Sequence, residues 1–207
     1  MLRKFAVLAV IVCAGSCVEA GNASIGSVVA QGELRMDGHS VQGSGTVFDG
    51  TMVETGSELQ STADLRLSSG TKITLHNNSS GTLYRDRFVL IRGEADMDAS
   101  GSFRVEVSGL VIKPSVPGTS ELIAIAPGGA VSVLARTGQL QIEETSGQVL
   151  AQIHPQQPQA FSRNANGDWQ IGGASSQDSR DGDQGCNADG GHGDDCDHHH
   201  RHHHHSH

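Results

Sequence analysis

Cysteine is missing from the middle of this 207-residue chain. The four cysteines, Cys13, Cys17, Cys186 and Cys196, all lie near one of the two ends. Residues between these groups have no disulfide available to them, so a fold there must rely on apolar burial and backbone hydrogen bonds. A small disulfide-stapled scaffold is therefore excluded for this part of the chain.

Aromatic residues are scarce as well, at 3% of the sequence. Bases and sugars are commonly held by stacking on aromatic side chains, and few are present for that purpose. The formal net charge is -9, and lysines and arginines form no stripe along the chain. Nucleic-acid recognition needs a basic surface, so we expect no nucleic-acid partner.

Long hydrophobic runs are absent too. The longest, residues 5–14, falls short of the roughly twenty residues that cross a bilayer, and it follows the basic pair Arg3 and Lys4. This layout predicts a signal peptide over residues 1–20, cleaved after Ala20, and export to the periplasm or beyond the cell without a membrane span in the mature form. The alternative is a lipoprotein attached through Cys17, although the box before Cys17 lacks the usual large aliphatic residue at its start.

Sequence motifs of common enzyme classes are also missing. The chain contains no HExxH zinc motif, no phosphate-binding P-loop, no dinucleotide-binding GxGxxG after a strand and no GxSxG elbow before a helix. We therefore expect no catalytic residues, no required cofactor and no enzyme activity.

The spacing of the histidines before the C-terminal segment does not indicate a catalytic or metal site, and the acidic residues there are dispersed. His39, His76 and His154 each stand in a turn-like context, which favours solvated side chains over a shared metal. The acidic run GEADMD carries carboxylates at alternate positions, which places them on one wet strand face. Such a face is a solvated surface or, alternatively, a calcium site formed by Glu94, Asp96 and Asp98.

Short alternating runs separated by glycine dominate residues 21–172. Segments such as ADLRLSS, TKITLHN, FRVEVSG and AVSVLAR alternate apolar and polar side chains, which is typical of strands with one buried face. Glycines between the runs recur about every ten residues and supply turn positions. The pattern predicts an all-β domain of stacked short strands, either β-solenoid-like or a β-sandwich, and periodicity does not decide between the two.

Residues 25–161 resemble the FecR-like domain of exported bacterial proteins. The resemblance lies in the order of turns and strand residues: Asp49-Gly50, Val53, Thr55, Ala63, Leu65, Leu67, Gly70-Thr71, Ile73 and Leu75. Further similar segments are LIRGEADMD around Gly93, VPGTSEL at Gly118-Thr119 and AVSVLARTGQLQI around Gly138.

The resemblance implies a β-rich extracytoplasmic domain without catalytic machinery. Only residues 1–4 precede the apolar run, so we expect a free-standing form without the cytoplasmic segment through which the namesake proteins regulate a sigma factor. The sequence departs from the family pattern after Gly118-Thr119. Ser120 and Glu121 stand where the family usually places Phe, and Leu122 is expected to take over its role.

The C-terminal segment, residues 173–207, has a different composition. From Asp178 onward it contains seven aspartates, nine histidines and two cysteines with almost no apolar residue, which predicts disorder. Arg201 and Ser206 interrupt the histidine run, which favours a native tail over a purification tag. Imidazole and thiolate bind nickel, copper and zinc, so we predict these metals on His192, Cys196, His198, His199, His200, His202, His203, His204, His205 and His207.

Two further expectations concern this tail. Cys186 and Cys196 form a disulfide in an oxidising compartment, or else act as soft metal ligands; the disulfide is favoured. Below about pH 6 the imidazoles become protonated and the tail should release its metal.

Three functions remain open from the sequence. The first is a non-enzymatic interaction or scaffold module of the bacterial envelope, whose partner is an unidentified envelope protein or surface polymer. The second is a metal-handling protein in which the tail is the functional part. The third, weaker one is a polysaccharide-binding module, which the scarcity of Trp and Tyr disfavours.

Overall fold

The structure is a computed structural model that describes residues 23–173, and this part is all-β, as predicted. Sheet A contains nine strands in the spatial order β18 (Trp169–Gly173), β17 (Gln159–Arg163), β14 (Val131–Thr137), β13 (Ser120–Ile125), β10 (Glu94–Asp98), β7 (Lys72–Leu75), β6 (Thr62–Leu67), β1 (Ser24–Gln31) and β4 (Ser44–Phe48). Sheet B contains β16 (Val149–Ile153), β15 (Leu140–Glu144), β12 (Leu110–Pro114), β11 (Arg104–Val107), β9 (Arg87–Arg92), β8 (Ser80–Leu83), β5 (Thr51–Thr55), β2 (Leu34–Met36) and β3 (His39–Val41).

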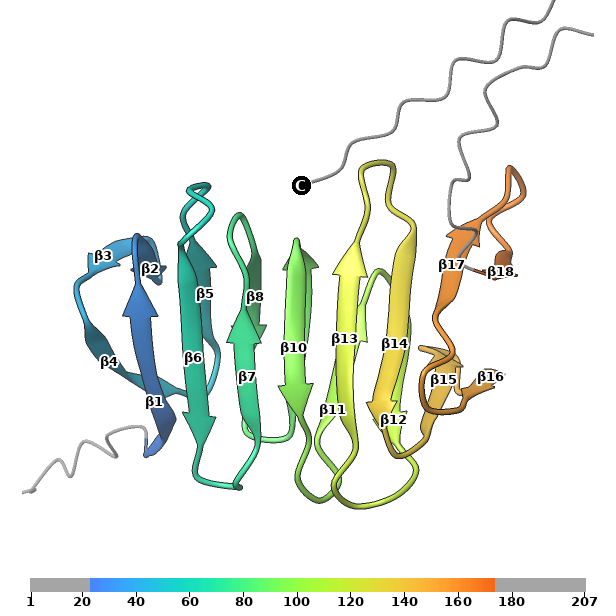
Figure 1. The fold of residues 1–207 in the computed structure, drawn as a ribbon, viewed down its shortest axis with the longest axis horizontal. Helices are drawn as coiled ribbons and strands as arrows, with labels where there is room; N and C mark the ends of the chain where they lie inside the picture. Colours follow the sequence, from blue (N-terminus) through green and yellow to red (C-terminus); the bar gives the residue numbers. More distant parts are fainter. Residues whose placement is uncertain (1–22, 174–207) are drawn as a thin grey trace, which may run out of the picture. The chain divides into compact units, whose positions relative to one another are not determined.

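The chain builds both sheets together by passing back and forth between them. Hairpins β6–β7 and β13–β14 belong to sheet A, whereas β8–β9, β11–β12 and β15–β16 belong to sheet B. Strand order along both sheets therefore follows the sequence, except at the N-terminal end, where β4 lies outside β1 and β3 lies outside β2 (Figure 1). All neighbouring strands are antiparallel except β9 and β11, which are parallel. The fold is thus a two-sheet sandwich that grows by stacking successive hairpins.

Alternation of apolar and polar residues explains why the sheets face each other. Along β6 the buried residues are Ala63, Leu65 and Leu67, and along β12 they are Leu110 and Ile112. These inward side chains belong to one hydrophobic core that both sheets share. Each buried leucine or isoleucine contributes about 1.5–3 kcal/mol when it leaves water, so apolar burial is the main stabilising term of this sandwich.

One close approach inside sheet B requires glycine. Gly81 in β8 lies under the ring of Phe88 in β9, and a Cβ at this position would be 2.3 Å from the ring carbon Cζ. Phe88 itself is fully buried. The missing side chain at Gly81 therefore makes room for the largest core residue of this hairpin.

Strand β13 corrects one expectation from the sequence. Glu121, not Leu122, faces the core: Glu121 is 0% exposed, and Leu122 lies on the outer face beside Leu134. Successive strand residues point to opposite faces, so only one of these two neighbours can be inside. The prediction that Leu122 replaces the inward aromatic residue is wrong.

Several predictions concern residues that the structure does not describe. The signal peptide, its cleavage after Ala20, lipidation at Cys17 and the tail with its Cys186–Cys196 pair lie outside residues 23–173 and stay predictions. The domain boundaries at 20/21 and 172/173 stay predictions as well. Within residues 23–173, no helix is long and apolar enough to cross a membrane.

Candidate functional site

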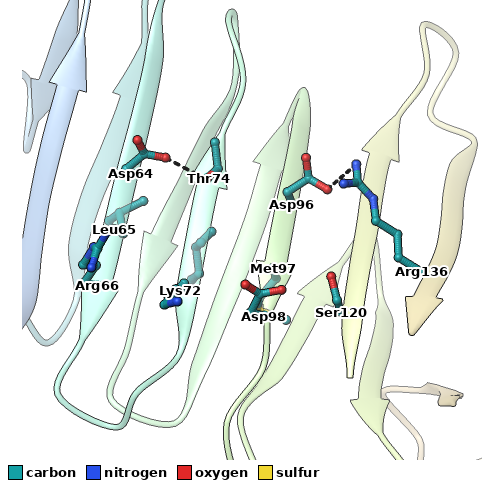
Figure 2. Close-up of a pocket in the computed structure, with 11 residues that line it drawn as sticks. Asp64, Leu65, Arg66, Lys72, Thr74, Asp96, Met97, Asp98, Ser120 and Arg136 are labelled. Atoms are coloured by element: carbon teal, nitrogen blue, oxygen red, sulfur yellow. Dashed lines mark hydrogen bonds and ion pairs between the residues drawn. The ribbon is translucent and has the colours of Figure 1, made fainter. Parts of the chain in front are cut away.

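The outer face of sheet A carries a shallow hollow of about 360 Å³ that crosses strands β6, β7, β10, β13 and β14. Charged and hydroxyl side chains gather there because every second residue of these strands points away from the core. Figure 2 shows those that line it: Asp64, Arg66, Lys72, Thr74, Asp96, Asp98, Ser120 and Arg136. We call this feature the sheet A hollow.

Asp96 forms the fixed centre of the sheet A hollow. Its Oδ2 lies 2.9 Å from Nε2 of His76, which follows β7, and its Oδ1 lies 2.6 Å from a guanidinium nitrogen of Arg136. The Arg136 contact is an ion pair without hydrogen-bond alignment, since Oδ1 accepts no hydrogen bond from the described residues. Arg136 sits at a register shift between β13 and β14, and bulges of this kind redirect a side chain. Asp96 is therefore held between two cationic or hydrogen-bonding side chains.

The neighbouring row of the same face is charged but unpaired. Arg66 in β6 is directly across from Lys72 in β7, and Lys72 is directly across from Asp98 in β10. Among the described residues, no carboxylate oxygen lies within 4.0 Å of the Arg66 or Lys72 nitrogens. Like charges directly opposite each other repel, so this pair of cations attracts an anionic group from outside the sheet.

The acidic run of β10 lies as the alternation predicts. Glu94, Asp96 and Asp98 all point outward, while Ala95 and Met97 between them are buried. The carboxylate of Asp96 already contacts His76 and Arg136. Within residues 23–173, no group of three or more His, Cys, Asp and Glu side chains is placed to hold a metal ion.

The structure does not bring the three early histidines together. His39 lies exposed in β3 and His154 lies exposed after β16, at opposite edges of sheet B. His76 follows a strand of sheet A and precedes the turn at Asn77, but its side chain is not freely solvated as predicted, because its Nε2 lies 2.9 Å from Oδ2 of Asp96. The predicted metal ligands of the tail, from His192 to His207, lie outside the described residues.

Glu121 is unusual because its carboxyl group is buried inside the sandwich, beneath the sheet A hollow. It is directly across from Met97 in β10 and Ala135 in β14, both buried. Neither carboxyl oxygen has a hydrogen-bond partner among the described residues. Burial raises the pKa of Glu121 to about 8, because a carboxylate is poorly solvated there. Glu121 is therefore a neutral acid at neutral pH.

On the outer face of sheet B, the charges of Arg87 and Arg104 pair with acids of the same face. Arg104 contacts Asp86 at 2.9 Å and Glu106 at 3.2 Å, and Arg87 contacts the same two acids at 3.2 and 3.4 Å. This closed group covers the parallel pair of β9 and β11. Its charges are satisfied within the chain, so the unpaired cations of the sheet A hollow are the stronger candidate for a contact surface.

Another ion pair of sheet B joins its strands β12 and β15. Lys113 donates to Glu143, and this hydrogen bond lowers the pKa of the Glu143 carboxyl. Burial opposes the effect, and a hydrogen bond from Gln141 adds to it. The charges of Lys113 and Glu143 therefore compensate each other within the chain.

Sequence reasoning missed the contacts of the sheet A hollow. His76, Asp96 and Arg136 are separated by 20 and 40 residues along the chain. Only the order of strands in sheet A brings them together. The alternation in each strand placed these residues outside, but no local signal in the sequence specified which strands are neighbours.

Comparisons with known proteins give a limited likeness. No family model matches the chain, and no curated protein matches it. Two crystal structures described as a "putative anti-sigma factor" from Parabacteroides distasonis ATCC 8503 resemble it with a TM-score of 0.46 and 18% sequence identity. The match covers 59% of this chain and 59% of that chain. At this level the likeness carries no conclusion about activity or partners.

Proposed function

We propose that this chain is a non-enzymatic, exported interaction or scaffold module of the bacterial envelope, FecR-like in its β-domain and carrying a metal-binding histidine-rich tail. The observation that carries the proposal is the pair of adjacent, unpaired cations Arg66 and Lys72 on the sheet A hollow. Two adjacent cations on an outward strand face fit a partner that presents carboxylates.

A protein partner fits this surface better than a polysaccharide does. The hollow is shallow, and no aromatic ring lines it. Trp169 lies in the last strand under the guanidinium of Arg163, and Tyr84 is covered by Arg87. Sugars are usually held on free aromatic faces, so a surface of charges and hydroxyls favours an acidic face of an envelope protein.

In-cell photo-crosslinking tests this proposal. A photoreactive residue replaces Ser120, which lines the sheet A hollow, and in a matched control it replaces Thr82 on the outer face of sheet B. We expect one discrete protein adduct from position 120 and none of that mass from position 82. The same adducts from both positions, or none from either, would contradict the proposed surface.

The composition of the tail supports a second candidate, a metal-handling protein. Nine histidines and seven aspartates lie within residues 178–207, a dense set of ligands for copper, nickel or zinc. Deletion of residues 174–207 separates the two functions. If growth in excess metal is unchanged by the deletion, the metal-handling function is excluded, and the interaction module remains.

A further inference from the structure

The edge strands of both sheets lack two of the features that normally keep edges from pairing, charged residues and prolines, although β3 has only three residues and β16 pairs with β15 through a register shift. β3, β4, β16 and β18 contain no Asp, Glu, Lys, Arg or Pro, whereas every interior strand except β1 and β8 carries at least one charged residue. Edge strands expose unpaired backbone N–H and C=O groups, and charges or prolines usually prevent them from pairing with another chain. Uncharged edges on both sheets therefore indicate surfaces that can accept further strands.

The two ends of the sandwich differ in how well they cover the core. At the N-terminal end, a Cβ on Gly45 of β4 would lie 2.8 Å from Sδ of Met36, so this strand packs directly on sheet B. Its neighbour Val47 is 0% exposed. This end is closed, because β3 and β4 follow each other along the chain and fold over the last core residues.

At the C-terminal end the core remains open. Ile171 of β18 is directly across from the buried Phe161, so both side chains point toward the sandwich interior. Ile171 is nevertheless 49% exposed, since no strand lies beyond it. On the sheet B edge at this end, Val149 of β16 is 51% exposed and lies on the outer face, directly across from Glu143. Both open edges lie at the same end of the fold (Figure 1).

The directions of the strands indicate which arrangement of a second copy of this chain fits the C-terminal end of the sandwich. A two-fold axis perpendicular to the sheets would pair β18 with β18 and β16 with β16 of a second copy, antiparallel in both sheets. A head-to-tail arrangement would place β18 beside β4 in sheet A, and these strands run in the same direction because all steps across sheet A are antiparallel. In sheet B the same arrangement would pair β16 and β3 antiparallel, because the β9–β11 step is parallel, so only the two-fold arrangement is antiparallel in both sheets. Antiparallel pairing is the more stable, and two-fold symmetry closes the assembly.

We propose that the C-terminal end of the sandwich, formed by β16 and β18, is the interface of a symmetric dimer with a second copy of this chain. The dimer continues both sheets across the axis and covers Ile171. It uses a different surface from the sheet A hollow, so it does not depend on the proposed partner protein.

Sedimentation of the full exported chain tests the dimer. EDTA and a thiol reductant are included, so that neither metal on the tail nor its cysteines can join two copies. We expect a dimer mass for the wild-type chain and a monomer mass for Ile171→Lys, which places a charge at the open edge. The matched control, Thr46→Lys in the edge strand β4 at the closed end, should remain dimeric.

Folding of each variant is checked by far-UV circular dichroism. If Ile171→Lys does not fold, Gln170→Lys replaces it, because Gln170 is exposed on the same strand and leaves the apolar residue intact. A wild-type monomer at the highest soluble concentration would overturn the proposal and leave this end to a strand from another protein. Dissociation by Thr46→Lys but not by the β18 variants would overturn it as well, since the interface would then lie at the other end.

Discussion

Glu121 illustrates how one residue can make stability depend on pH. The unfolded carboxyl titrates near 4.5 and the folded one near 8, so the folded state holds its proton over the interval between these values. The contribution of Glu121 to the free energy of unfolding should therefore be largest near pH 4.5 and below, and fall as pH rises to 8. The total loss is about 5 kcal/mol, from about 1.4 kcal/mol for each pH unit.

Replacing Glu121 by Gln removes this titration while keeping a side chain of similar size. We expect the Glu121→Gln chain to lose much less stability than the wild type between pH 5 and pH 8.5. Urea unfolding of both chains at several pH values measures this difference. Subtracting one pH curve from the other cancels the contributions of all other titrating groups. Parallel pH curves for the two chains would show that Glu121 is solvated in the folded protein.

Lys113 and Glu143 should show the opposite pH dependence. The folded pKa of Glu143 is lowered, so its contribution to stability is present at neutral pH and is lost as pH falls through that value. We expect Lys113→Met to raise the Glu143 pKa toward its ordinary value and to cost up to about 1 kcal/mol at pH 7. Carbon-detected NMR titration of the Glu143 carboxyl measures this shift, and an unchanged midpoint would rule out the hydrogen bond as its cause.

Hairpin β8–β9 allows a test of packing at the scale of an element. In Gly81→Ala the new methyl group would overlap the Phe88 ring, so we expect a loss of about 1–3 kcal/mol, as for other overpacked cores. Adding Phe88→Leu makes room for the methyl group, and the double variant should lose less than the sum of the two single variants. Urea unfolding of the four chains measures the coupling, and additive losses would place the ring away from Gly81.

The element scale also shows what the sequence could predict. Alternating runs predicted the buried faces of β6, β7, β11, β14 and β15 correctly, because charged or polar residues occupy the outward positions, apart from Leu134 in β14. In β13 the segment SELIAI has apolar residues at both parities, so the pattern alone does not determine which face is buried. A slip of one residue exchanges the two faces, and this is how the inward position of Glu121 was missed.

At the scale of the whole molecule, strand order is the information that the sequence did not provide. The contacts of Asp96 with His76 and Arg136 depend on β7, β10 and β14 lying in one sheet with β13 between the last two. Composition predicted an acidic, non-nucleic-acid-binding β-domain, but it could not indicate the adjacent cations of the sheet A hollow. Arg66 and Lys72 meet only through the register of β6 and β7.

Metal binding by the tail is a prediction about the intact chain. Histidines bind metal in their neutral form and titrate near pH 6.5, so we expect bound nickel or zinc to be released between pH 7.5 and pH 5. Equilibrium dialysis measures the retained metal, with a chain lacking residues 174–207 as the control. Equal retention at both pH values, or by the shortened chain, would contradict metal binding through the tail histidines.

Charge reversal at Arg66 tests the central claim most directly. The photoreactive residue stays at position 120, and the yield of its adduct is compared between the unreversed chain, Arg66→Glu and the control Arg92→Glu, which lies in β9 of sheet B. We predict that the yield falls several-fold with Arg66→Glu and is unchanged with Arg92→Glu. An equal yield from all three chains would contradict the role of the sheet A hollow in binding an acidic partner.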